Sequence, residues 1–272
     1  MTTQPPAPTC FWHPDRPTYL RCSRCDRYIC PDCMRSAAVG QHCPACVREA
    51  AQTVRAPRLR PAAPVVTYTF IAISVVMFVV QLAAQDVERL LVLNSLAVAD
   101  GQWYRLLTST FLHFGPVHLL FNMWALYVVG PPLEAALGRL RFTALYLAGA
   151  LGGSVLVYLL APLNAATAGA SGAVFGLFAA TLVIGRRLNL DVRWVLALIV
   201  INLVITFSVP GISWQGHIGG LVSGALVAAL YVYPTGRSRT AVQVLGTLAL
   251  LAVFAVLVVV RTGDLLSTFT LR

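Results

Sequence analysis

From residue 65 onward the chain alternates between long apolar stretches and short polar segments. The apolar stretches cover residues 65–84, 116–133, 142–160, 171–185, 192–209, 215–233 and 241–260. Most are long enough to cross the hydrocarbon core of a bilayer as a helix. In lipid, helices keep every backbone hydrogen bond within one segment. We therefore predict an all-α polytopic membrane protein with seven spans.

The composition supports a membrane body and separates a small head from it. Of the 272 residues, 58% are hydrophobic and 11% are charged, whereas a soluble domain has roughly 25% charged residues. All seven cysteines lie between Cys10 and Cys46, so residues 1–50 are predicted to form a separate domain. Residues 51–64 are rich in Ala, Pro and Arg and are predicted to be a linker. Residues 1–10 lack the apolar segment of a secretory signal, so we expect a cytoplasmic head.

The net charge of +10 is distributed in alternate loops. Arginines precede the first span and follow the second, fourth and sixth, whereas residues 161–170 and 210–214 carry no charge. This is the positive-inside pattern, and it predicts a multi-pass protein of the cell membrane with a cytoplasmic N-terminus and an extracytoplasmic C-terminus. Because membrane topology accounts for the positive charge, we expect no nucleic-acid partner.

Two polar residues in apolar surroundings are candidates for chemistry. Ser171 lies in Gly-Ala-Ser-Gly at the start of the fourth span, and His217 lies in Gly-His-Ile-Gly-Gly of the sixth. The fourth span would be roughly 22 Å long against a core of roughly 30 Å, which places Ser171 below the outer surface. The non-helical segment before it must then line a water-filled cavity or be buried in protein. Glycines four residues apart in both spans allow close helix packing. The sequence predicts a serine nucleophile with a histidine base.

A second polar cluster begins the span at 116–133. His118 and Asn122 share one helix face, and both can donate hydrogen bonds to the oxyanion of a tetrahedral intermediate. His113 and His118 could instead form a metal pair, but no cysteine or carboxylate accompanies them. For His113 we favour a structural role.

These motifs resemble, in their order and placement, the rhomboid intramembrane serine proteases. The resemblance covers residues 65–233 and rests on the Trp-Tyr-Arg segment that ends at Arg105, on His113, His118 and Asn122, on Gly-Ala-Ser-Gly and Gly-His, and on residues 134–139 as the acidic-then-glycine loop after the second span. It implies a six-helix rhomboid-like core at 65–233. Residues 234–272 would then add one transmembrane helix and a C-terminal tail.

The resemblance also implies roles for individual residues. The protein would be an intramembrane serine endopeptidase that cleaves transmembrane protein substrates near the outer face of the lipid bilayer. Trp103 and Arg105 would shape a loop along the membrane surface, and Phe175 stands where relatives often have a tyrosine that packs on the histidine. The site would consist of Ser171 as nucleophile, His217 as general base, and His118, Asn122 and the Ser171 N–H as oxyanion donors. Gly169 would allow the tight approach of the loop before the nucleophile.

The residues themselves favour a dyad that uses no cofactor. No Asp or Glu lies within the fourth, fifth or sixth span, so no carboxylate is expected to orient His217, which packing and Ser171 would hold. The same observation argues against an aspartyl protease, and the absence of His-Glu-x-x-His argues against a membrane zinc protease. The alternative is a catalytically silent rhomboid-like protein that binds membrane helices. A transporter, or an anchor for the head, fits the pattern less well.

The head contains four pairs of potential metal ligands. Pairs of ligands with two residues between them are typical of zinc sites. Seven cysteines with His13 supply eight ligands for two structural ions. An odd cysteine count and a cytoplasmic location argue against disulfides. The spacing over residues 10–46 resembles a B-box-type zinc finger, which implies one site of Cys10, His13, Cys30 and Cys33 and another of Cys22, Cys25, Cys43 and Cys46. Sequential pairing, or His42 in place of Cys43, stays open. We expect the head to bind an unknown cytoplasmic protein.

Overall fold

The computed structural model describes residues 6–37, 39–53 and 63–270. It divides into two compact units, Met1–Pro61 and Ala62–Arg272, which are described separately below. Most of the linker predicted at 51–64 lies outside the described residues, although helix α1 (Pro44–Thr53) continues past residue 50.

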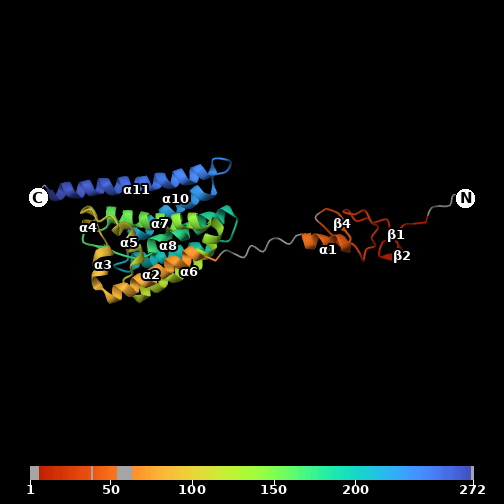
Figure 1. Ribbon diagram of the computed structural model, residues 1–272, viewed down its shortest axis with the longest axis horizontal. Helices are drawn as coiled ribbons and strands as arrows, with labels where there is room; N and C mark the ends of the chain where they lie inside the picture. Colours follow the sequence, from red (N-terminus) through yellow and green to blue (C-terminus); the bar gives the residue numbers. More distant parts are fainter. Residues whose placement is uncertain (1–5, 38, 54–62, 271–272) are drawn as a thin grey trace. The chain divides into compact units, whose positions relative to one another are not determined.

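The first unit is built from short elements around its cysteines. Strands β1 (Thr9–Cys10) and β2 (His13–Pro17) pair in antiparallel fashion, as do β3 (Arg35–Ser36) and β4 (Gln41–His42), and α1 follows (Figure 1). The buried core consists of Ile29 and six of the cysteines. So small an apolar core supplies little folding free energy, as is usual in domains that a metal stabilises.

The second unit is helical throughout the predicted spans, which confirms the all-α polytopic fold. Among the described residues, four helices are long and apolar enough by themselves to cross a bilayer, namely α2, α7, α10 and α11, whereas α8 and α9 have 17 and 16 residues. Helix α6 qualifies only together with the segment Arg105–Phe111, from which it bends by 92°. The helices are α2 (Val65–Ala83), α6 (Pro116–Leu137), α7 (Arg139–Leu160), α8 (Ser171–Arg187), α9 (Arg193–Ser208), α10 (Trp214–Val232) and α11 (Arg239–Thr270).

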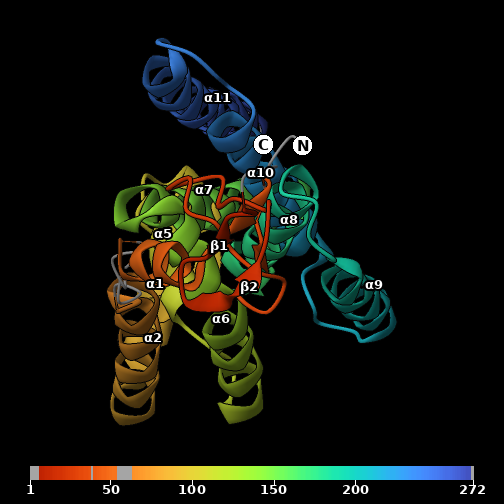
Figure 2. The ribbon, with the colours of Figure 1, turned by 90° about the vertical axis from the view of Figure 1, so that its right-hand side faces the viewer.

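Glycines bring α8 and α10 into backbone contact in the middle of the bundle, with α7 beside them (Figures 1 and 2). A Cβ atom added at Gly220 would lie 1.9 Å from the carbonyl oxygen of Gly172, and one at Gly224 would lie 2.3 Å from that of Gly176. No larger residue fits at these positions, so the predicted close approach is confirmed.

The segment between α2 and α6 forms a folded layer that the sequence pattern did not reveal. It contains α3 (Gln85–Leu91), α4 (Ser95–Ala99), α5 (Arg105–Thr108) and the 3₁₀ helix η1 (Ser109–Phe111). Strand β5 (Leu93–Asn94) pairs with β6 (Ala166–Thr167), just before Ser171. The buried Arg105 donates hydrogen bonds to the carbonyl oxygens of Arg89 and Val92, each at 2.8 Å. This layer therefore fixes the approach to Ser171.

The loop expected at residues 134–139 is wrong except at Gly138, because α6 continues to Leu137 and α7 begins at Arg139. Glu134 is buried, and its carboxylate accepts hydrogen bonds from the backbone N–H groups of Val66 and Thr67 and from the Thr67 hydroxyl, at 2.8–3.0 Å. These are the free N–H groups at the start of α2. The carboxylate therefore joins the end of α6 to the start of α2.

Helix α11 is longer than the predicted span at 241–260 and lies along the rest of the bundle (Figure 1). Its Thr262 hydroxyl lies 2.8 Å from that of Tyr158 on α7. Val258 and Leu265 share an apolar cluster with Leu93 of β5. The added helix thus supports the layer that holds the segment before Ser171.

Candidate functional site

A cavity of about 750 Å³ lies among α6, α8, α9, α10 and the segment before α8. It combines an apolar wall with a few polar groups, as ligand and active sites commonly do. Apart from His113, every residue predicted for the site lines it: His118, Asn122, Gly169, Ser171, Phe175 and His217.

Ser171 is the first residue of α8 and is partly exposed in the cavity. The chain before it is held by β6 and by a hydrogen bond from the Gly169 N–H to the Ser109 carbonyl oxygen at 2.9 Å. At a helix start the first N–H groups have no partner within the helix and carry the positive end of its dipole. The position of Ser171 thus combines a hydroxyl with free N–H groups.

His217 is buried in the first turn of α10 and is held on two sides. The ring of Phe175 stacks on it, with centroids 4.2 Å apart and planes inclined by 13°. The hydroxyl oxygen of Thr206 lies 2.7 Å from His217 Nδ1. The same hydroxyl donates to the Asn202 carbonyl oxygen at 2.6 Å. Because Thr206 has one hydroxyl proton, this arrangement leaves its oxygen to accept a hydrogen bond from Nδ1–H.

Sequence reasoning missed Thr206. It is one of three buried residues on α9, together with Val195 and Ile199. The available signal was a pair of polar residues, Asn202 and Thr206, four apart in an otherwise apolar stretch. Such a pair shares one helix face. The spacing gave no indication that this helix face contacts His217.

The structure brings Ser171 and His217 into one cavity without joining them. Among the described residues, no hydrogen bond links the Ser171 hydroxyl to the His217 ring. Catalytic hydrogen bonds are often long in proteins without substrate and shorten in the bound complex.

His118 and Asn122 present donors to the same cavity. Nδ1 of His118 accepts a hydrogen bond from the Phe114 N–H at 3.3 Å, which assigns the ring proton to Nε2. Asn122 donates one amide hydrogen to the His118 carbonyl oxygen at 2.9 Å and keeps a second. Gly169 has φ +130°, and a Cβ atom there would lie 2.7 Å from His118 Nε2. The His118 ring therefore lies against the backbone that precedes Ser171.

His113 is buried outside the cavity lining. Its ring Nε2 accepts a hydrogen bond from the Ala170 N–H at 3.5 Å, and its backbone N–H donates to Gln81 Oε1 at 3.0 Å. Within the described segments, clusters of three or more potential metal ligands occur only in the first unit. The contacts of His113 therefore support the chain around Ser171.

Comparison with known proteins gives the family. The family model of the Rhomboid domain matches residues 100–234. The putative rhomboid protease YdcA of Bacillus subtilis (strain 168) is 34% identical over 151 residues, which cover 53% of this chain and 74% of YdcA. The chain belongs to the rhomboid family. The rhomboid protease GluP of the same organism is 38% identical over 183 residues, covering 63% of this chain and 36% of GluP. The rhomboid protease AarA of Providencia stuartii is 28% identical over 170 residues, covering 52% of this chain and 60% of AarA.

The matched region of this rhomboid runs from just before α5 to the end of α10 and includes the polar residues of the cavity described above, namely His118, Asn122, Ser171, Thr206 and His217. The head and α11 lie outside it. The chain spans only 36% of the length of GluP, so the likeness to that protein is confined to part of it.

The head of the rhomboid holds two clusters of four potential ligands. In each, the ligand atoms lie within 4.8 Å of one another, in the sets Cys10, His13, Cys30, Cys33 and Cys22, Cys25, Cys43, Cys46. Two sulfur–sulfur distances, Cys10–Cys33 at 3.9 Å and Cys25–Cys43 at 3.8 Å, agree with the value of about 3.8 Å for tetrahedral zinc with Zn–S bonds of about 2.3 Å. The geometry of both clusters fits a tetrahedral cation.

The thiols of the head differ in acidity. Burial raises the pKa of the Cys33 thiol to about 11 and that of the Cys46 thiol to about 12. For Cys22, burial also raises the pKa, but backbone N–H groups that donate to the sulfur outweigh it and lower the pKa to about 6. Thiolates are the form that binds metal. A cation would have to displace protons from Cys33 and Cys46 to complete its ligand set.

Proposed function

We propose that this rhomboid is an intramembrane serine endopeptidase. The observation that carries the proposal is the single cavity that collects Ser171, His217 and the donors of His118 and Asn122 within a bundle of apolar helices. The relatives YdcA, GluP and AarA are themselves named rhomboid proteases, which supports the same class for this chain.

In the proposed mechanism, His217 Nε2 removes the hydroxyl proton of Ser171 as its oxygen attacks the peptide carbonyl carbon. Thr206 accepts from Nδ1–H, so Nε2 is the unprotonated nitrogen that acts as base. The oxyanion receives hydrogen bonds from His118 Nε2–H, Asn122 Nδ2–H and the Ser171 N–H. His217 then gives the proton to the leaving amine, and water hydrolyses the acyl-enzyme by the same steps. The proposed mechanism therefore uses a Ser-His dyad, in which the neutral Thr206 orients the histidine.

The proposed substrate is a transmembrane segment. Apolar side chains of two helices line the cavity: Phe121, Trp124 and Val128 on α6 and Leu198, Ile201 and Ile205 on α9. An apolar segment can make favourable contacts with such walls, whereas a soluble peptide would lose hydration there. By the positive-inside rule, the arginines in the first turn of α7, at the end of α8 and at the start of α9 lie in the cytoplasm. Cleavage would then occur near the outer face.

We further propose that the head binds two structural zinc ions through the two clusters described above. Each set is closed, with four protein ligands and no position for a substrate. The ions would stabilise the fold of the head, which then serves as a contact surface for a cytoplasmic protein.

Activity-based labelling tests the assignment of the protease. We expect a fluorophosphonate to label the full-length protein in mild detergent, and we expect Ser171→Ala and His217→Ala to abolish the reaction. Ser154→Ala is the matched control, because Ser154 is a buried serine that lines the same cavity, and its labelling should be unchanged. Labelling that persists in Ser171→Ala would refute the nucleophile. No labelling of the wild-type protein would instead favour a silent rhomboid that binds membrane helices.

A further inference from the structure

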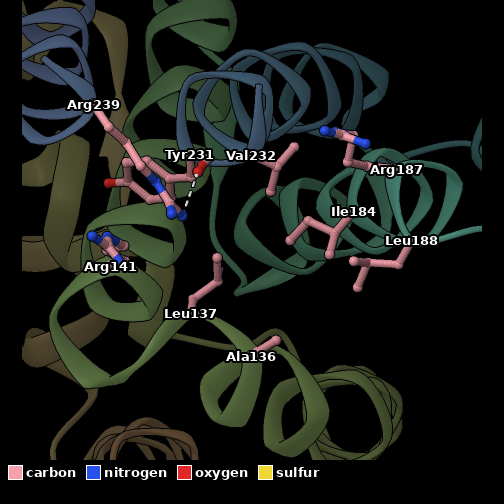
Figure 3. A pocket seen from close by; sticks show the side chains of 9 residues that line it. All are labelled: Ala136, Leu137, Arg141, Ile184, Arg187, Leu188, Tyr231, Val232 and Arg239. Carbon is pink, nitrogen blue, oxygen red and sulfur yellow. Dashed lines mark hydrogen bonds between the residues drawn. The ribbon is translucent and has the colours of Figure 1, made fainter. Parts of the chain in front are cut away.

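A second pocket, of about 340 Å³, lies where helix ends meet on the basic side of the membrane body. It shares no residue with the cavity around Ser171. Figure 3 shows side chains that line it from the end of α6, the start of α7, the ends of α8 and α10, and the start of α11. Helix α11 contributes Arg239 to this lining.

Three arginines from three helices converge on the pocket. In Figure 3, Arg141 and Arg239 appear at the same end of the pocket as Tyr231, and Arg187 appears at the other end. Leu137, Ile184 and Val232 form apolar lining between them, so the pocket is amphipathic. These positions separate a positively charged rim from an apolar interior.

The charges of these arginines are not neutralised within the described part of the chain. Arg141 and Arg187 have no ion pair or hydrogen bond there, and Arg239 has one hydrogen bond, at 3.5 Å, to the Tyr231 carbonyl oxygen. No residue that lines the pocket is acidic. Of the acids close to the lining residues in sequence, Glu134 caps the start of α2, and Asp191 accepts a hydrogen bond from the Arg193 N–H. The pocket is therefore complementary to an anion.

We propose that this pocket binds the phosphate headgroup of an anionic phospholipid from the cytoplasmic leaflet. Arginine pairs with phosphate through two parallel hydrogen bonds, and basic pockets between transmembrane helices suit such headgroups. The apolar lining favours a lipid over a free anion, because it offers contact to the glycerol and acyl part of the molecule. The rim arginines reach α7, α8 and α11, so a bound lipid joins the added helix to the core.

Lipid binding by the full-length protein in mild detergent tests the proposal independently of protease activity. Native mass spectrometry would count bound lipid during titration with phosphatidylglycerol, phosphatidylethanolamine, diacylglycerol or inorganic phosphate. We expect one tightly bound phosphatidylglycerol per chain. The triple variant Arg141→Gln, Arg187→Gln, Arg239→Gln should weaken the affinity for phosphatidylglycerol on the order of 100-fold, because each arginine is expected to contribute about fivefold.

The matched control is the triple variant Arg186→Gln, Arg193→Gln, Arg237→Gln, which removes the same charge from the same face outside the pocket. We expect it to retain wild-type affinity within about threefold. Elution volume and melting temperature show that both variants are folded. Equal loss in both variants, or phosphatidylglycerol binding no tighter than phosphatidylethanolamine, would overturn the proposal. Inorganic phosphate that occupies the pocket and is not displaced by phosphatidylglycerol would overturn the lipid assignment.

Discussion

The Thr206 hydroxyl oxygen lies 2.7 Å from Nδ1 of His217, on a helix that contributes only two other buried residues to the bundle. The same hydroxyl donates to the Asn202 carbonyl, so the imidazole is the donor in the first contact. In a serine–histidine–aspartate triad, a carboxylate holds the histidine tautomer. In the proposed dyad, a neutral hydroxyl takes that place without bringing a charge into the membrane, where a carboxylate would be costly.

Replacement of Thr206 by valine should therefore slow catalysis. The change keeps the shape of the side chain but leaves the Nδ1–H of His217 buried and unpaired, which costs about 1–3 kcal/mol, or about fivefold to 150-fold in rate. Thr206→Ser retains the acceptor and should recover most of the rate. The measurement is the rate of fluorophosphonate labelling of the full-length protein.

A matched control separates this effect from loss of a helix hydroxyl. Thr247 donates to the carbonyl four residues earlier on α11, as Thr206 does on α9, and lies away from the cavity. Thr247→Val should label at the wild-type rate. If Thr206→Val also labels at that rate, the hydroxyl has no part in positioning His217.

Gly169 should not tolerate even alanine. Its φ of +130° is rare for residues with a side chain, and the new Cβ atom would press on the ring of His118 at 2.7 Å. The backbone strain alone costs about 1–3 kcal/mol. Displacing the proposed His118 donor should reduce the labelling rate by at least about 100-fold, as removal of an oxyanion donor does in serine proteases.

Gly101→Ala is the control for Gly169→Ala, because Gly101 also has a positive φ of +91° but has nothing within 4 Å of the added Cβ atom. It should lower the melting temperature while leaving the labelling rate per folded protein unchanged. A similar small loss of rate in both variants would show that His118 does not depend on the glycine.

The long helices were predictable because their signal is local. Seven apolar stretches became α2 and α6–α11, since lipid permits few other conformations for such segments. The layer between α2 and α6 was not predictable from the pattern. Its pairing of Leu93 with Thr167 involves strands of two residues far apart in the sequence, which have no periodicity to detect.

The site was predictable in its residue types and less so in its contacts. Ser171 and His217 could be identified because polar groups are rare in apolar segments, and the spacing of the glycines on α8 and α10 predicted close packing. Thr206 could not be predicted as the partner of His217, because a threonine in a membrane helix usually forms a hydrogen bond only to the backbone of its own helix. Its second contact depends on how α9 lies against α10.

Glu134→Gln should lower the stability of the membrane body. The carboxylate accepts three hydrogen bonds at the start of α2, and the amide keeps one acceptor oxygen without the charge. Hydrogen bonds to a charged group contribute about 1.5–3 kcal/mol, so we expect a loss of that order in the free energy of unfolding in detergent.

A double-mutant cycle with Thr67→Val isolates the contact of Glu134 with the Thr67 hydroxyl. The two changes should couple by about 0.5–3 kcal/mol, because the residues share one hydrogen bond. Strict additivity would show that the buried carboxylate stabilises the bundle without the hydroxyl.

Metal analysis of the full-length protein should find two zinc ions per chain, because the two clusters supply two complete ligand sets. Cys43→Ser should remove one ion and leave the other, since Cys43 belongs to a single cluster. His42→Ala should retain both ions, because His42 belongs to neither cluster, although it precedes Cys43. Exhaustive chelation should unfold the head, seen as rapid proteolysis within residues 6–53, while the melting temperature of the membrane body is unchanged. Retention of both ions in Cys43→Ser together with loss of one in His42→Ala would replace Cys43 by His42 as the ligand.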